Sequence, residues 1–394
     1  MLFSYLRRGG ALLFVAAITF TLIPSGLSAA EPYDINVIVS LTGPFAFVGK
    51  GSQAGLLGVE KITNAAGGIN GRPIRFVFQD DQSNPQAAVQ LAGALIAKKI
   101  PVLLGPTSVA GCSAVAPLVR NGPVLYCLSP GLYPPPGSWA FSANVASKDT
   151  MAIAIRYFNL RGLRRLAMIA ATDASGQDQE RGIDAALALP VNAGMTLVAR
   201  EHFSPGDVSV AAQIARIKAA NPQVLLALST GAAIATVLRA VHDAGLDIPV
   251  FTTNGNSTYA QMKQYAAFLP KELYFPDQPP LALNAITDKG VRAQIDLFIR
   301  TMRSMGVKPD GIPATTWDPG LLVVAALKKY GFGMTADQLK EFLSNLQDWP
   351  GAMGRYNFRE VPQRGLSVQS CIITKWEPRT DWWVAVSKPA GSPL

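Results

Sequence analysis

The sequence predicts an α/β fold made of two Rossmann-like, doubly wound lobes. Short apolar runs alternate with helical stretches along most of the 394 residues, as expected when helices cover both faces of a parallel sheet. The chain is 49% hydrophobic, which is enough for two cores, and one domain of this length would be unusual. Proline-rich breaks interrupt the alternation at three places, so we expect the chain to cross between the lobes three times.

Residues 1–30 have the features of an export signal that is removed from the mature protein. Arg7 and Arg8 precede an apolar segment from Ala11 to Ile23, and small residues end at Ala30. A membrane anchor is the alternative, but the apolar segment is shorter than the roughly 20 residues that span a bilayer. We therefore expect a cleaved signal peptide and a freely diffusing periplasmic protein.

The predicted strands are compact apolar runs bounded by turn residues. They lie at 35–41, 74–80, 102–104, 124–129, 166–171, 197–202, 224–229 and 250–253, with two more near 371–375 and 383–386. Helices are predicted between them at 52–65, 85–98, 113–119, 149–160, 208–219 and 232–244. Pro85 after Asn84 is a favourable helix start, and Gly245 is a favourable stop.

The proline-rich breaks at 131–144, 274–280 and 349–351 define the predicted lobes. The N-terminal lobe would contain residues 31–143 plus 277–352, and the C-terminal lobe residues 144–276 plus 353–386. Pro389 and Pro393 predict a loose tail over 387–394.

Charge and cysteine content limit the classes of protein to consider. Thirty-five Lys+Arg against 26 Asp+Glu give a net charge of +9, but the charges are scattered singly. Without a basic run or a patch of interleaved aromatic residues, nucleic-acid binding is not expected. Cys112 and Cys127 are predicted at the same end of a sheet. They either form a disulfide in an oxidising compartment or remain two small, buried apolar side chains.

Several short motifs follow one another in a characteristic order. They are LTGP at 41–44, NAAGGING at 64–71, DD at 80–81 with NP at 84–85, GP at 105–106 and SPG at 129–131. With these motifs, residues 33–386 resemble the type I periplasmic binding proteins of ABC transporters, in the leucine/isoleucine/valine-binding protein family. The resemblance implies a Venus flytrap with three hinge strands that traps a ligand as its lobes close. It also implies delivery to an ABC permease and its ATPase subunits at the inner membrane. We expect a monomer without a cofactor.

Polar loops follow two predicted strands of the first lobe, at the carboxyl ends where open α/β sheets bind ligands. Their hydroxyls, together with free N–H groups at the start of the next helix, suit a carboxylate. In the related family the corresponding loops hold the ligand's α-carboxylate. The candidate ligand-binding residues on these loops are Thr107, Ser108, Val109, Ser129, Gly131, Leu132 and Tyr133.

Candidates from the second lobe would close on the ligand from the other side. Ser229 and Thr230 follow a predicted strand, although they would equally cap the helix at 232–244. Ser175 stands where the family carries an aromatic residue, which opens room. Phe47, beside a second such position at Val48, would offer a stacking surface.

Asn254 departs from the family in a way that bears on the ligand. Family members carry at this place a glutamate that binds the ligand's α-ammonium, whereas Asn254 is neutral and cannot form a charge-assisted bond. A buried, unpaired ammonium costs several kcal/mol. We therefore expect an aromatic or other organic acid without an α-amino group. Asp173 in the second lobe is the alternative acid, and with it an amino acid would again fit.

The sequence gives little support for an enzyme. His202 and His242 lack metal-ligand spacing, and no G-x-S-x-G motif occurs. We expect no catalytic residues and no metal site. The alternatives to an organic-acid importer are a branched-chain or other amino-acid binding protein and a ligand sensor of the same fold.

Overall fold

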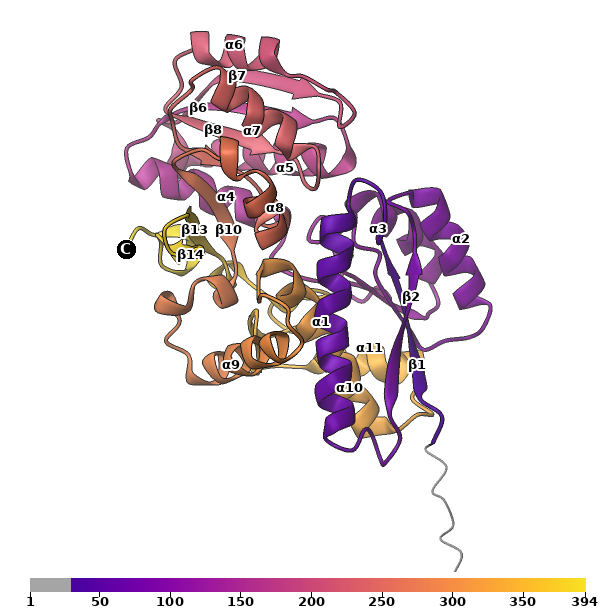
Figure 1. Ribbon diagram of the computed structural model, residues 1–394. Helices are drawn as coiled ribbons and strands as arrows, with labels where there is room; N and C mark the ends of the chain where they lie inside the picture. Colours follow the sequence, from indigo (N-terminus) through magenta and orange to yellow (C-terminus); the bar gives the residue numbers. More distant parts are fainter. Residues whose placement is uncertain (1–29) are drawn as a thin grey trace, which may run out of the picture.

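The structure is a computed structural model, and it describes residues 30–394. The predicted signal peptide at 1–30 lies outside the described residues except for Ala30. Two sheets, each flanked by helices, form two lobes (Figure 1). The predicted α/β class is confirmed.

The first sheet is parallel throughout, with the strand order β2-β1-β3-β4-β5. Its strands are β1 (Tyr33–Val39), β2 (Ile74–Asp80), β3 (Val102–Leu104), β4 (Val124–Cys127) and β5 (Ala140–Ser142). Neighbouring strand residues point to opposite faces, so each face packs on different helices. Val37 packs in one core with Leu56 of α1 (Ala46–Ala65), and Ile38 in another with Ala92 of α2 (Pro85–Ile96).

The second sheet has seven strands in the order β14-β13-β10-β9-β8-β6-β7. These are β6 (Arg165–Ala171), β7 (Thr196–Phe203), β8 (Val224–Leu228), β9 (Val250–Phe251), β10 (Leu273–Asp277), β13 (Ile372–Glu377) and β14 (Trp382–Ala385). Pairing is parallel from β7 to β10 and antiparallel for β13 and β14. On β6, Met168 and Ile169 lie in separate cores, as expected for a sheet covered on both faces.

The other helices cover these sheets or join them. They are α3 (Val109–Val115), α4 (Ser147–Leu160), α5 (Ala174–Leu187), α6 (Ala211–Ala219), α7 (Ile234–Asp243), α8 (Tyr259–Gln264), α9 (Lys289–Ser304), α10 (Gly311–Tyr330) and α11 (Ala336–Asn345). The chain leaves the first sheet after β5, and it returns after β10 so that α10 packs along α1 (Figure 1). It rejoins the second sheet at β13.

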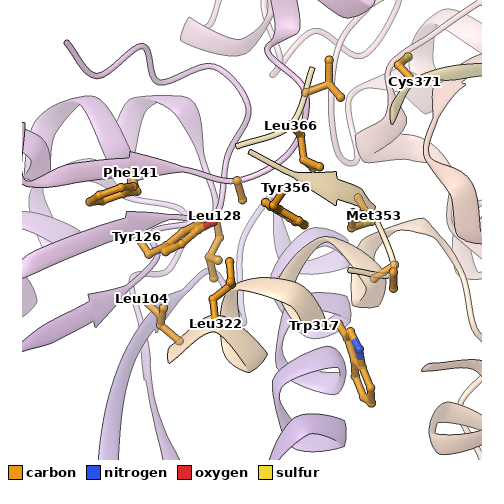
Figure 2. Packing of buried hydrophobic residues seen from close by; sticks show 14 of the residues in the cluster. Leu104, Tyr126, Leu128, Phe141, Trp317, Leu322, Met353, Tyr356, Leu366 and Cys371 are labelled. Atoms are coloured by element: carbon orange, nitrogen blue, oxygen red, sulfur yellow. The ribbon is translucent and has the colours of Figure 1, made fainter. Parts of the chain in front are cut away.

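The region around the predicted boundary at 352/353 contains a hairpin, β11 (Trp349–Gly351) with β12 (Gly354–Tyr356). Tyr356 lies in the same core as Tyr126 and Phe141 of the first sheet (Figure 2). Tyr126 and Phe141 stack with their centroids 6.0 Å apart, and Phe141 meets Phe358 edge-on at 5.8 Å. The lobe limits remain predictions, but these contacts join the start of the last segment to the first lobe.

Several helix limits differ from the sequence-based prediction. The helix predicted at 52–65 begins already at Ala46, and α5 was not predicted. Glycines lower helix propensity in both places. The structure nevertheless requires glycine at both positions. A Cβ at Gly49 would overlap the Ser40 carbonyl, and one at Gly176 would overlap the Ala171 carbonyl. Close packing of a helix against a strand end therefore overrides local propensity.

The prediction of a loose tail at 387–394 is wrong. Ser387 pairs with Pro393 in an isolated β-bridge, and the Ala390 N–H donates to the Cys371 carbonyl. Gly391 is buried against Ile153 of α4. Prolines do not loosen the segment here, since the backbone groups on either side of them find partners.

Asp277, at the end of β10, is a fully buried carboxylate where the chain leaves the second sheet. Its oxygens accept hydrogen bonds from the hydroxyls of Ser257 (2.6 Å) and Thr374. Burial raises the pKa of Asp277 to about 7, against an ordinary value of 3.8. The folded protein therefore holds a proton on this group more tightly than the unfolded chain does.

We predict that this carboxyl makes the protein less stable as the pH rises. Its contribution is fully present below pH 3.8 and is lost as the pH rises through about 7, at about 1.4 kcal/mol for each unit between the two pKa values. Asp277→Asn should flatten the fall in unfolding free energy between these pH values, as measured by urea denaturation. The exposed control Asp247→Asn should keep the slope of the natural protein. Equal slopes for both variants would contradict the prediction.

Candidate ligand-binding site

A cavity of about 60 Å³ lies where the two lobes face each other. It is built mainly from loops that follow strands of both sheets, the place where open α/β sheets bind ligands. Helices α1, α4, α5 and α10 complete the wall. The lining residues are Phe45, Val48, Thr107, Ser108, Val109, Leu128, Ser129, Pro130, Asn144, Ser147, Thr150, Met151, Ser175, Gln179, Thr230, Thr253, Asn254, Gly255, Ile312 and Thr315.

The wall from the first lobe carries hydroxyls that also organise its loops. The Thr107 hydroxyl lies 3.3 Å from the Ser40 N–H and from the Ser40 hydroxyl. Ser40 in turn donates to Asp81 at 2.7 Å. Ser108 is the N-cap of α3 and accepts from the Gly111 N–H at 3.0 Å. Asp81, the second of the paired aspartates in the sequence, thus supports Thr107 through Ser40.

The wall from the second lobe is a chain of hydrogen bonds. Gln179 Nε2 donates to the Ser175 hydroxyl at 3.1 Å, and Ser175 donates to Thr230 at 3.0 Å. Thr230 and Thr253 are also 3.0 Å apart. Ser175 and Gln179 meet because residues four apart lie on one face of α5. Four polar side chains are thereby held in place around the cavity.

Asn256 supports this wall from behind. Its buried side chain donates to the Ser229 carbonyl at 2.7 Å and accepts from the Gly231 N–H at 3.1 Å. Gln261 adds a bond to the Gly231 carbonyl at 3.0 Å. The loops that carry Thr230 and Asn254 are therefore fixed to each other by buried amides.

The third part of the wall begins where the chain first crosses between the sheets. Asn144 is 3% exposed and has a backbone φ of 66°, a left-handed conformation that asparagine tolerates better than most residues. Its carbonyl and that of Ala143 accept from Arg364 Nη1 at 2.9 and 3.2 Å. Arg364 also donates to the Leu132 carbonyl at 2.6 Å. Burial lowers the pKa of Arg364, and the three carbonyls offset the cost of burying the cation.

The lobes also touch at the rim of the cavity. The Ala232 N–H, at the start of the α7 region, donates to the Pro44 carbonyl of the first lobe at 3.2 Å. The Tyr133 hydroxyl donates to Asp178 at 3.3 Å and accepts from the Lys148 N–H at 3.2 Å. The first contact joins the first lobe to the segment before α7, and those of Tyr133 join it to α4 and α5. Hydrogen bonds thus link the two lobes at the rim of the cavity.

The residues that line the cavity carry no carboxylate, imidazole, thiol, amine or guanidinium. Asp173 is the N-cap of α5, accepting from the Gly176 N–H at 2.8 Å, and it does not line the cavity. Across residues 30–394, no group of three His, Cys, Asp or Glu side chains could hold a metal ion. A ligand would therefore meet hydroxyls, amides and apolar side chains.

Residues 32–381 match the family described as periplasmic binding protein. The chain belongs to this family. The match covers the first sheet, all strands of the second sheet except β14, and every element that lines the cavity. No helix in the described part of this periplasmic binding protein is long and apolar enough to cross a membrane.

Two curated proteins resemble the chain in sequence. The Leu/Ile/Val-binding protein homolog 3 of Brucella melitensis is 26% identical over 241 residues, which are 59% of this chain and 64% of that protein. The Leu/Ile/Val-binding protein BraC3 of Rhizobium johnstonii is 22% identical over 352 residues, 87% of this chain and 91% of that protein. The aligned stretch thus spans just under two thirds of the Brucella protein.

Solved structures share the fold of this periplasmic binding protein. An extracellular ligand-binding receptor from Rhodopseudomonas palustris HaA2 superposes with a TM-score of 0.78 at 19% identity, covering 91% of this chain and all of that one. The branched-chain amino acid transporter substrate binding protein LivJ from Streptococcus pneumoniae, solved with isoleucine, has a TM-score of 0.74 at 17% identity. That match covers 90% of this chain and 98% of LivJ. These similarities confirm the predicted type I periplasmic binding protein fold.

Seven of the twelve predicted ligand-binding residues line the cavity. The seven are Thr107, Ser108, Val109, Ser129, Ser175, Thr230 and Asn254. They come from loops after strands and from the start of α5, which periodicity alone could place near one edge of each sheet. Their contact with a ligand remains a prediction.

Two predicted residues near the crossing point do not line the cavity, which corrects the prediction. Tyr133 is 42% exposed and its hydroxyl bonds to Asp178 and Lys148, so it links the lobes. Burial raises the pKa of Tyr133 to about 12, so the phenol remains the hydrogen-bond donor. Leu132 contributes its carbonyl to Arg364. Each is displaced because the loop after β4 turns toward the crossing segments.

Three further corrections have local causes. Phe47 lines a separate hollow of about 500 Å³ with Lys50, because one helical step turns it away from the face that carries Val48. Gly131 is packed so closely that a Cβ would meet Val109 Cγ2 at 2.6 Å. Ser229 is fully buried one residue before Thr230, on the opposite side of the strand end.

Sequence reasoning missed Gln179 of α5 and the residues contributed by helices α4 and α10. Gln179 follows Ser175 by four residues, a spacing that would have found it once α5 was predicted. Ile312 and Thr315 are three apart at the start of α10, a region to which no helix was assigned. Asn144 had no sequence signal, since its position depends on Arg364 more than 200 residues later.

Cys112 of α3 and Cys127 of β4 form a disulfide with Cα atoms 5.8 Å apart. Of the two alternatives left by the sequence, the structure has the bridge. Both cysteines lie close to cavity residues, since α3 begins at Val109 and Leu128 follows β4 directly. The bridge therefore ties together two loops of the cavity wall.

We predict that removing this bridge destabilises the protein by about 3 kcal/mol, the loop-closure value for a separation of 15 residues. The measurement is chemical denaturation of the Cys112→Ser, Cys127→Ser double variant. Dithiothreitol should lower the melting temperature of the natural protein and leave that of the double variant unchanged. If the reductant affects both proteins alike, the bridge does not contribute as expected.

Proposed function

We propose that this protein is the substrate-binding component of an ABC importer and that it captures a small carboxylate ligand without an α-amino group. The neutral lining of the cavity carries the proposal. An α-ammonium would need a carboxylate partner when buried, whereas hydroxyls and backbone N–H groups at the first-lobe wall suit a carboxylate. The ligand's body would pack on Val48, Met151 and Ile312.

Family membership supports the transport role. The family name denotes periplasmic binding proteins, and the relatives and the LivJ structure carry names from branched-chain amino acid transport. In such a system the protein would act in the periplasm after removal of its signal peptide and deliver its ligand to a permease with ATPase subunits. Binding energy shared between the two lobes would favour the closed form over the open one.

The second candidate is an amino-acid binding protein. Its support is that both curated relatives are named for leucine, isoleucine and valine and that LivJ was solved with isoleucine. Asp173 was the residue that would have restored an acid for the ammonium, but its carboxylate caps α5. Asp178, also on α5, is engaged by Tyr133 and Arg181.

The proposal is tested with the signal-free chain and matched ligands. Isocaproate, isovalerate and benzoate lack an amino group, and leucine and valine carry one on similar skeletons. We expect at least one of the acids to raise the melting temperature by several degrees when present far above its Kd, with no shift for leucine or valine. A shift with leucine or valine alone would favour the amino-acid candidate instead.

We further predict that Asn254→Leu weakens binding of the best acid about tenfold or more, since one lost hydrogen bond to a charged group costs roughly 1.5–3 kcal/mol. The Asn254 side chain lines the cavity and has no hydrogen-bond partner among the described residues. Its replacement should therefore leave the melting temperature of the free protein nearly unchanged. Asn284→Leu, on the exposed loop after β10, is the matched control and should bind normally. Calorimetry showing equal affinity for both variants would remove Asn254 from the site.

A further inference from the structure

Two buried side-chain amides of the cavity wall have polar atoms without a partner in the protein. Asn144 is 3% exposed and Gln179 is 6% exposed, and both line the cavity. Asn144 Oδ1 and Gln179 Oε1 accept no hydrogen bond within residues 30–394. Buried acceptors of this kind cost free energy unless a ligand or water supplies the donor.

The orientation of the Gln179 amide follows from the hydroxyl chain beside it. Its Nε2 donates to Ser175, the Ser175 hydroxyl donates to Thr230, and Thr230 can then donate to Thr253. The Ser175 hydroxyl accepts one bond and donates one, and the Thr230 hydroxyl also accepts from Gln179 Nε2 at 3.4 Å. The chain uses the nitrogen of Gln179 and leaves its oxygen free.

The orientation of Asn144 is fixed through its backbone. Arg364 holds the carbonyls of Ala143 and Asn144, and the Ala143 N–H donates to the Cys127 carbonyl at 2.8 Å. The left-handed φ of 66° is a conformation that few side chains accept. Hydrogen bonds of the surrounding backbone therefore fix the position of Asn144, while its side-chain oxygen has no partner among the described residues.

We propose that Asn144 and Gln179 recognise a neutral hydrogen-bond donor of the ligand, a hydroxyl in the first instance, so that the ligand is a hydroxy acid. This inference rests on the proposed function, and it adds the second polar group of the ligand. A ligand hydroxyl can donate its single hydrogen to either of these amide oxygens. An ammonium at the same place would lack a carboxylate among the residues that line the cavity.

The test compares three ligands that share one skeleton and differ at one carbon: isocaproate, α-hydroxyisocaproate and leucine. A second pair, benzoate and para-hydroxybenzoate, places the hydroxyl on a ring. In calorimetry with the signal-free protein, we expect the better hydroxy acid to bind about tenfold more tightly than its parent acid. Leucine should bind least well of its series.

Asn144→Gly keeps the left-handed backbone available while removing the amide. The preferred hydroxy acid should then bind no better than its parent acid. Asn144→Asp should increase the affinity for leucine about tenfold, because the new carboxylate supplies the negative charge that an ammonium needs. Asn70→Gly is the matched control: Asn70 also has a positive φ, of 50°, but lies in an exposed turn away from the cavity. Its affinities should equal those of the natural protein, and melting curves verify that each variant is folded.

Two results would overturn the inference in different ways. If hydroxy and parent acids bind equally while both exceed leucine, the role of Asn144 and Gln179 is refuted and the proposed function stands. If leucine binds most tightly, or if none of the acids binds, the proposed function fails and the inference fails with it.

Discussion

The buried guanidinium of Arg364 is the interaction on which the rest of the site depends. It is 5% exposed and donates to three backbone carbonyls, those of Leu132, Ala143 and Asn144. These carbonyls belong to the segment that leaves the first sheet, and Arg364 belongs to the segment that later rejoins the second. A planar, permanently charged group with several donors can hold such a junction where a flexible amine could not. The position of Asn144 follows from it.

The cavity itself is polar but uncharged. Hydroxyls from Thr107, Ser175, Thr230 and Thr253 line it, and most of them are already bonded to one another or to loop backbone. Such a wall is rigid, so a ligand finds its partners in place and loses little free energy in ordering them. In such a wall, the unpaired amide oxygens of Asn144 and Gln179 remain available to accept a hydrogen bond from a ligand.

Direct hydrogen bonds join the lobes at the rim of the cavity. They are those of Pro44 with Ala232 and of Tyr133 with Asp178. A ligand that touches both walls would add to these bonds and so favour this arrangement over one in which the lobes are farther apart. The acidic partner of Tyr133 is buried, and burial raises the pKa of Asp178. The link thus joins a buried carboxyl to a tyrosine that is itself 42% exposed.

The sequence alone determined the alternation of strands and helices, the two sheets and the loops at their carboxyl ends. Each of these depends on local apolar runs and on turn residues such as Asn84-Pro85, which act within a few positions. Through its resemblance to the family, the sequence also indicated that Asn254 stands where relatives carry a glutamate. Only the tertiary structure decided which residues of those loops face the cavity. Phe47 and Val48 are neighbours, and a single helical step separates the hollow from the cavity. Asn144 entered the site through contacts between segments far apart in sequence, with Arg364. Such contacts leave no periodic trace in the chain, because long-range packing rather than local propensity selects them.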